Sequence, residues 1–349
     1  MNLKIHLYLR PIFGARFMKK LLLLLFSLLV GLALLVWVWG MVGPEIIIDA
    51  FLVFTGWDGL VIFSLTLLML GIGTWRWREI LKAGNIDMPF RKLFGPYLAG
   101  FSIMFLAPIF VWGGELVRTY LLKNRNSVDF TKGMASVIID RILEWTVNLI
   151  VIFIGSIFFF SAIGIHPTKL LVIFGGIFFI FLSALAYFYF KCARKESIVC
   201  VFVKNKKSKL LALEREMFNF FKWGKPAVWK GIMLSFLRAA VMYVRAWFLI
   251  GFLGKIIGAS SVLSVLGFSY VAVMIPIPAA LGSHEAIQVF AFSSLGLGVS
   301  TATAFTMIIR GAELIAALIG IILLFKLGVI LIKDALFKKL DNLVEDEKE

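Results

Sequence analysis

The chain has 349 residues, of which 61% are hydrophobic and only 16% are charged, and its mean hydropathy is +0.98. This composition excludes an ordinary soluble domain and makes lipid the expected main solvent of the protein. The net charge of +16 does not indicate nucleic-acid binding, because the basic residues lie in clusters between apolar runs. The apolar runs are unbroken rather than alternating, which predicts an all-α, polytopic membrane protein.

The basic clusters predict which ends of the apolar runs face the cytoplasm. Most of the 36 Lys and Arg residues fall in five segments, namely the residues before 21, 76–92, 118–132, 191–230 and the residues after 325. By the positive-inside rule, these segments are cytoplasmic. Cys192 and Cys200 both fall in the fourth segment, on the side where thiols stay reduced, so no disulfide is predicted.

In chain order, the first span covers about 21–41 and is too long for a cleaved signal sequence, so we expect it to be retained. A second span returns to the cytoplasm near residue 80. The next apolar stretch, 93–122, has basic clusters at both ends, which favours a re-entrant helical hairpin over two short spans. Its interruptions are Pro108, Gly113 and Gly114.

Two further spans, at about 133–163 and 170–190, lead out and back to a basic loop at 191–230. The loop contains lysines followed by aromatic residues, among them Phe218 and Trp229. That composition suits an interfacial helix on an anionic leaflet, although it is also explained by a topology signal alone.

A span at about 231–253 leads out, and a second broken stretch at 258–297 is expected to be a hairpin that opens to the outside. Its interruptions are Pro276, Pro278 and Gly282. The last span, about 301–325, returns to a short cytoplasmic tail at 333–349. The sequence therefore predicts six spans, two re-entrant hairpins and two cytoplasmic termini.

The two hairpins and the spans that follow them carry the same pattern of residues. The first copy has Pro108, Glu115, Arg141 and Glu144, and the second has Pro278, Glu285, Arg310 and Glu313, at offsets of 169 or 170 positions. Three spans separate the hairpins, so the second copy should be inverted in the membrane. We therefore expect two inverted repeats, at about 21–163 and 168–332, which is an architecture of transporters.

Arginine inside a span is costly unless it is paired or hydrated, so Arg141 and Arg310 are the leading candidates for binding a substrate anion. Glu144 and Glu313 follow three residues later on the same helix face and would support them. The alternative is that these are neutralised ion pairs used for packing. Hairpin helix N-termini aimed at the membrane midplane would add N–H groups for a phosphate.

Other candidates surround this pair. Glu115 and Glu285 would hold the arginines, recognise a cationic head group or carry a proton, and the sequence does not choose among these. Arg118 is a further candidate, and its counterpart in the second copy is Gln288. Arg245, whose repeat partner is Arg76, is preferred to Arg238, for which snorkelling is the alternative.

His284, beside Glu285, is expected to form hydrogen bonds and not to bind a metal, because no second histidine follows four residues later. The chain has three histidines in all, and neither cysteine lies near His284 in the sequence. No metal site, cofactor or nucleotide-binding loop is predicted.

The paired motifs resemble the lysylphosphatidylglycerol synthase transmembrane region family, also called flippase-like membrane proteins. The residues that carry the resemblance are Pro108, Gly114, Glu115, Arg118, Arg141, Pro276, Pro278, Leu281, Gly282, Glu285 and Arg310. The resemblance implies movement of an aminoacylated phospholipid or a polyprenyl-linked carrier between leaflets. The family's soluble aminoacyl-transferase domain is expected to be absent. The chain departs from the family pattern at two places. Asp140 precedes Arg141 where many relatives have Glu, and Ala279–Ala280 follow Pro278 in place of the usual glycine-rich sequence. These differences bear on the identity of the substrate more than on the fold.

The resulting functional expectation is a non-enzymatic flippase for an anionic phospholipid or a polyprenyl-phosphate-linked lipid, with Asp140 among its supporting residues. A second hypothesis is a membrane subunit that binds polyprenyl phosphate for a glycosyltransferase partner without transporting it. A third is an intramembrane enzyme that modifies lipids, which the motifs do not support. The expected location is the cytoplasmic membrane.

Overall fold

The structure is a computed structural model that describes residues 56–106, 113–126, 128–164, 168–194, 196–197, 209–221, 226–274 and 282–346. All regular elements within these ranges are helices. They are α4 (Trp57–Ala83), α5 (Phe90–Leu106), α6 (Gly113–Asn126), α7 (Phe130–Ile163), α8 (Thr168–Arg194), α9 (Lys209–Phe220), α10 (Pro226–Phe252), α11 (Ala259–Met274), α12 (Ser283–Ser294) and α13 (Val299–Asp346). The predicted first span and the hairpin prolines Pro108, Pro276 and Pro278 lie outside the described residues.

Four helices in the described part are long and apolar enough to cross a bilayer. They are α4, α7, α10 and the Val299–Leu327 part of α13. They coincide with predicted spans, so the all-α, polytopic membrane class is confirmed. The predicted span 170–190 is also helical, as α8, and it exposes Phe179 and Ile180, as a helix that faces lipid would.

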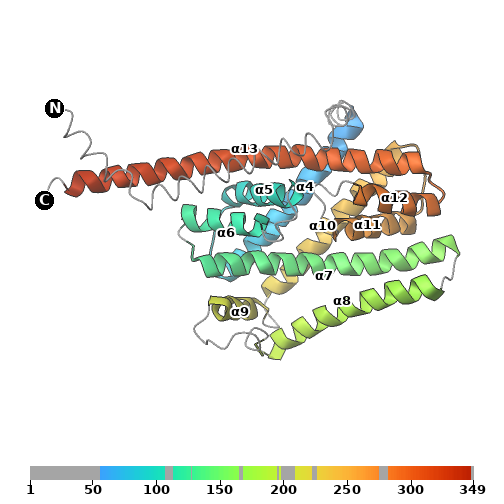
Figure 1. Ribbon diagram of the computed structural model, residues 1–349, viewed down its shortest axis with the longest axis horizontal. Helices are drawn as coiled ribbons and strands as arrows, with labels where there is room; N and C mark the ends of the chain where they lie inside the picture. Colours follow the sequence, from blue (N-terminus) through green and yellow to red (C-terminus); the bar gives the residue numbers. More distant parts are fainter. Residues whose placement is uncertain are drawn as a thin grey trace.

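The long helices enclose the shorter ones (Figure 1). α13 runs along one side of the molecule and α7 along the other, with α8 outside α7. Between them lie α5 and α6 towards one end and α11 and α12 towards the other, while α4 and α10 cross obliquely through the middle. α5 packs on α13 and α11 packs on α7, so each short pair bridges the two long helices.

Small residues permit these close helix contacts. A Cβ atom on Gly155 of α7 would lie only 2.6 Å from the carbonyl oxygen of Leu263 in α11. On the other side, Gly320 of α13 faces Leu98 and Ser102 of α5 with no room for a side chain. Lipid supplies no hydrophobic force between helices, so such close backbone packing is an important source of their association.

Corresponding helices begin at matching intervals along the chain. Trp57 and Pro226, Phe90 and Ala259, and Phe130 and Val299 are the first residues of the pairs α4/α10, α5/α11 and α7/α13, each pair 169 positions apart. The starts of α6 and α12, Gly113 and Ser283, are 170 apart. Contacts correspond as well, because α5 on α13 matches α11 on α7 and α5 on α6 matches α11 on α12.

Two predicted segments have more structure than the sequence indicated. α13 continues without a break to Asp346, so the predicted tail 333–349 is helical through that residue. The basic loop contains α9, yet Phe218, Phe220 and Phe221 are buried against residues of α4 and α7 such as Ile80 and do not face the membrane. An apolar helix face can pack against protein or against lipid. The sequence alone therefore did not distinguish an interfacial helix from a helix packed on the bundle.

Candidate functional site

Charged side chains from five helices lie buried inside the membrane-spanning bundle. They are Arg76 of α4, Glu115 and Arg118 of α6, Asp140 and Glu144 of α7, Arg245 of α10, and Arg310 and Glu313 of α13. Arg141 and Arg238 join them with side chains that are 16% and 13% exposed. Because burying an ion in the membrane is expensive, a group of this size is the leading candidate for a functional region.

Arg76 forms the centre of the network in the first half. Its Nε donates to Asp140 Oδ1 at 2.6 Å, its Nη2 to Glu144 Oε2 at 2.8 Å and its Nη1 to Ser235 Oγ at 3.1 Å. All three nitrogens of this fully buried side chain therefore have acceptors. Such complete pairing offsets the desolvation cost of the ion and fixes the geometry of α4, α7 and α10 relative to one another.

Glu144 accepts from two more arginines. Arg238 Nη1 lies 2.7 Å from Oε1, and Arg141 Nη1 lies 3.3 Å from Oε2. Arg238 thus points into the protein. The sequence had left snorkelling open for this residue, and the structure shows that its side chain does not snorkel. It was ranked below Arg245 because it has no repeat partner, since Met69 stands 169 positions earlier.

Arg141 is paired on every nitrogen. Its Nε donates to Glu115 Oε1 at 2.6 Å, its Nη1 to Glu144 as described, and its Nη2 approaches Met104 Sδ at 2.9 Å. The carboxylate of Glu115 therefore holds Arg141, one of the roles that the sequence left open. In this conformation each nitrogen of Arg141 already contacts an acceptor of the protein.

Arg118 lies in an aromatic box. Its Nη1 donates to Asp140 Oδ2 at 2.9 Å, and its guanidinium carbon lies 4.1 Å from the Trp77 ring centroid and 4.5 Å from that of Tyr97. Desolvated cation–π contacts of this kind contribute about 2 kcal/mol. Trp77 itself donates from Nε1 to Ser136 Oγ at 3.1 Å, which fixes the plane of its ring.

The second half repeats the central motif with different residues. Arg245 Nη2 lies 3.1 Å from Glu313 Oε1, and Arg310 Nη1 lies 2.9 Å from Glu313 Oε2. Arg245 Nη1 also donates to Thr66 Oγ1 at 3.0 Å. This arrangement matches that of Arg76, Glu144 and Arg141, including the hydroxyl acceptor on the opposing helix.

Several buried nitrogens in the second half have no hydrogen-bond partner among the described residues. They are Nε and Nη2 of Arg310, Nε of Arg245 and Nδ1 of His284. Glu285 does not satisfy them, because its Oε2 accepts from the backbone N–H of Gly282 at 2.6 Å and caps α12. An unpaired buried donor costs about 1–3 kcal/mol, and more when it is charged, so this group favours an added anion.

Comparisons with known proteins identify the family of the chain. The family model described as lysylphosphatidylglycerol synthase TM region matches residues 24–320. The chain belongs to this family. A UPF0104 membrane protein of Pyrococcus horikoshii is 28% identical over 342 residues, covering 88% of this chain and 97% of the relative. One from Methanocaldococcus jannaschii is 24% identical over 310 residues, covering 84% and 90%.

A third relative, a UPF0104 membrane protein of Methanothermobacter thermautotrophicus, is 24% identical over 266 residues, covering 70% of this chain and 78% of its own length. The resemblance inferred from the hairpin motifs is thus confirmed, and the chain is a membrane protein of the lysylphosphatidylglycerol synthase transmembrane region family. The family describes the chain's class, and the relatives' names state no substrate.

In this member of the family the two halves are chemically unequal. The Arg118–Asp140 ion pair of the first half is replaced at the corresponding positions by Gln288 and Ile309. Gln288 Nε2 instead donates to Ser269 Oγ at 2.6 Å, which is a neutral contact. The first half therefore holds a buried ion pair that the second half lacks. Buried nitrogens without a hydrogen-bond partner among the described residues occur in both halves, but those of Arg118 belong to a guanidinium that the Trp77 and Tyr97 rings cover.

The predicted residues fall into two groups. Glu115, Arg118, Asp140, Arg141 and Glu144 share one ion-pair network, while Arg245, Arg310 and Glu313 share another, with His284 and Glu285 close enough to interact electrostatically with Arg310. Gly113 and Gly114 begin α6, and Gly282 caps α12 with a φ of 79°. Sequence reasoning gave no site role to Arg76, Trp77 or Tyr97 and ranked Arg238 below Arg245. Of these residues, Arg76 had a usable signal in its repeat partner, Arg245. In the part of the chain that the structure describes, no cluster of His, Cys, Asp and Glu could hold a metal.

Proposed function

We propose that this protein is a non-enzymatic lipid translocator that moves a lipid with an anionic head group across the cytoplasmic membrane. The observation that carries the proposal is the set of buried nitrogens on Arg310, Arg245 and His284 that have no hydrogen-bond partner among the described residues of a membrane-spanning bundle. The lipid is an anionic phospholipid or a polyprenyl-phosphate-linked carrier, since both present a phosphate. The basic clusters support a cytoplasmic position for both chain termini, which is part of this proposal.

Two inverted repeats around this site would supply alternating access. The matched helix starts and the exchanged contacts of α5 with α13 and α11 with α7 support this interpretation. So does Figure 1, in which the α5–α6 and α11–α12 pairs lie towards opposite ends of the molecule. In such folds one repeat rocks against the other around a site near the membrane midplane.

The contact between α4 and α10 has the symmetry that such a movement needs. Arg76 of α4 reaches Ser235 of α10, and Arg245 of α10 reaches Thr66 of α4. The two contacts are equivalent and reciprocal, so the helices run antiparallel about a local two-fold axis. Each arginine also binds the glutamate of its own half, which couples this axis to α7 and α13.

The phosphate is placed against the second half. Arg310 offers Nε and Nη2, which together form the two-pronged donor geometry that matches phosphate oxygens. His284 lies at the start of α12, where the helix dipole also favours an anion. Arg141, with its nitrogens occupied, would be released for the same role only when the first half opens.

A lipid co-purification experiment tests the anion site. Arg310→Gln leaves Glu313 paired with Arg245, so it removes the donors without stranding a carboxylate. The matched control is the double variant Arg141→Gln with Glu115→Gln, which removes a complete ion pair from the first half.

Mass spectrometry of lipids bound to the purified proteins should show an anionic lipid retained by the wild type and by the control and depleted by about tenfold in Arg310→Gln. Equal lipid profiles in all three would make the Arg310 pair structural. A lipid that binds as expected but never changes leaflet would instead favour the subunit that presents polyprenyl phosphate to a glycosyltransferase.

A further inference from the structure

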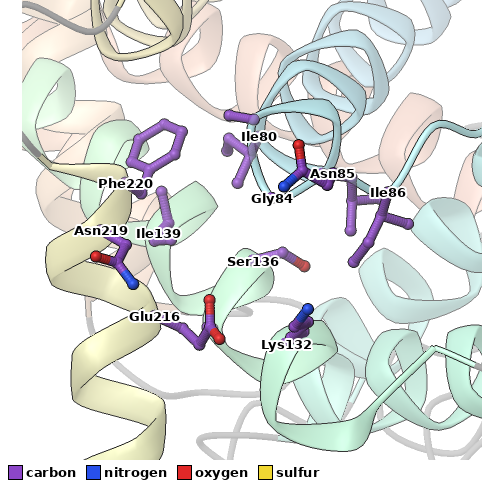
Figure 2. Close-up of a pocket in the computed structure, with 13 residues that line it drawn as sticks. Ile80, Gly84, Asn85, Ile86, Lys132, Ser136, Ile139, Glu216, Asn219 and Phe220 are labelled. Carbon is purple, nitrogen blue, oxygen red and sulfur yellow. The ribbon is translucent and has the colours of Figure 1, made fainter.

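A cavity lies away from the charged network, at the end of the bundle where α4 ends, α7 begins and α9 packs against them. It has a volume of about 230 Å³ and is partly open to the outside. Its wall is formed by residues 80–86 of the α4 end, by Lys132, Ala135, Ser136 and Ile139 of α7, and by Glu216, Asn219 and Phe220 of α9. Figure 2 shows these three elements converging on one open space.

The charges of the cavity wall are one cation and one anion. Lys132 and Glu216 are its only charged lining residues, and no ion pair within 4.0 Å joins them or ties either one to another described residue. Asn85, Ser136 and Asn219 add neutral hydrogen-bonding groups. A wall with separate, unpaired charges of opposite sign suits a ligand that carries both charges.

The helix ends beside the cavity are already satisfied. The first N–H groups of α7 donate to the carboxylate of Asp129, and the last carbonyls of α4 accept from backbone N–H groups of residues 84–86. The charges open to a ligand are therefore the side chains themselves, so a phosphate is favoured beside Lys132 and an ammonium beside Glu216. The apolar side chains of Ile86, Ile139 and Phe220 complete the wall.

The position of the cavity indicates where the ligand comes from. α4 ends and α7 begins here, with basic residues such as Lys82 and Lys132 at the same level, which is where lipid head groups lie beside spanning helices. The cavity is smaller than most drug-sized pockets, so it accommodates a head group and not a whole lipid.

We infer that this cavity binds a zwitterionic head group, with its phosphate beside Lys132 and its primary ammonium beside Glu216. The chemistry is that of phosphoethanolamine, either free or as the head group of a phospholipid. The site is separate from the anion site of the bundle, because none of Arg245, Arg310 and His284 lines this cavity. Binding here therefore requires no lipid transport.

Native mass spectrometry of the full chain in a non-ionic detergent tests the inference with three probes. These are dihexanoylphosphatidylethanolamine, dihexanoylphosphatidylglycerol and free phosphoethanolamine. Glu216→Gln should weaken binding of both ethanolamine probes by about tenfold and change phosphatidylglycerol binding by less than about threefold. Lys132→Met should weaken all three, because it removes the phosphate partner. Asp87→Asn and Lys123→Met, which change exposed charges of the same sign outside the cavity, are the matched controls.

The exchanged double variant Lys132→Glu with Glu216→Lys provides the sharpest result. It should recover free phosphoethanolamine, which can turn around, and should not recover the phospholipid, whose glycerol holds it in one orientation. Binding of the phospholipid alone by the wild type would identify the membrane as the source, and equal binding of the free compound would identify a soluble source. Ethanolamine probes that bind the wild type no better than phosphatidylglycerol, or that are weakened equally by the controls, would overturn the inference.

Discussion

Replacing Arg118 and Asp140 with the residues that occupy the corresponding positions of the second half tests how the first half is held closed. The variant is Arg118→Gln with Asp140→Ile, after Gln288 and Ile309. Each single change breaks the 2.9 Å ion pair, but only Asp140→Ile leaves a buried arginine, Arg118, without a carboxylate, because Arg76 keeps Glu144. The two changes should therefore be strongly non-additive.

The expected magnitudes follow from the contacts. Asp140→Ile removes the acceptor of Arg76 Nε and Arg118 Nη1 and strands a buried charge, which should cost about 3–5 kcal/mol in the free energy of unfolding. Arg118→Gln loses one charge-assisted hydrogen bond and its contacts with two aromatic rings, about 2–4 kcal/mol. The double variant loses the shared bond once and strands no Arg118, so its cost should fall about 2–3 kcal/mol below the sum.

The assay is a double-mutant cycle on the free energy of unfolding, measured by titrating the purified protein in mixed micelles with a denaturing detergent. Helicity and tryptophan fluorescence should give the same midpoint. A control cycle joins Arg118→Gln to Glu196→Gln, an exposed residue whose partner is Lys191, and should be additive within about 0.5 kcal/mol. An additive Arg118–Asp140 cycle would refute the claim that this pair closes the first half.

Two further predictions concern local structure. Gly155→Ala should destabilise the protein by about 1–3 kcal/mol, because the new methyl group would lie 2.6 Å from the carbonyl oxygen of Leu263. Gly251→Ala has open space around it and should stabilise its helix by about 0.5–1 kcal/mol. Thermal unfolding of both variants tests these two expectations. Asp129 caps α7, and hydrogen bonds from the backbone N–H groups of Lys132 and Thr131 lower the pKa of its carboxyl group. Its contribution to the free energy of unfolding should therefore be present above its unfolded-state pKa and lost as the pH falls through the lower folded-state pKa. Asp129→Ala should lower this free energy by about 0.5–2 kcal/mol near neutral pH and by much less in acid. An equal loss at both pH values would contradict the capping role.

Much of the fold could be predicted from the sequence, because the bilayer imposes a length on apolar helices and the basic loops report their direction. The spans near 133–163 and 231–253 coincide with α7 and α10, and the broken stretches 93–122 and 258–297 coincide with the helix pairs α5–α6 and α11–α12. The sequence did not predict that α13 continues to Asp346 or that Phe218 and Phe221 of the basic loop pack on the bundle. Both depend on partners that are distant in the chain.

The candidate site was predictable only where the two halves repeat each other. Arg141 and Arg310 were found from their common spacing to a following glutamate, and the structure places each against that glutamate. Arg238 was underrated because Met69 stands at its counterpart, and the box of Trp77 and Tyr97 around Arg118 has no local sequence pattern at all. Which arginine keeps unpaired donors is a property of three-dimensional packing that spacing does not encode.

The central claim is translocation, and the most direct measurement is the rate at which a labelled anionic lipid changes leaflet in proteoliposomes. The wild type should move phosphatidylglycerol or a polyprenyl phosphate faster than protein-free vesicles do, with or without an imposed ion gradient. Arg310→Gln should slow the exchange by about tenfold, while the Arg141→Gln and Glu115→Gln double variant should fold and retain binding. A folded wild-type protein that moves no lipid faster than empty vesicles under any gradient would contradict the account.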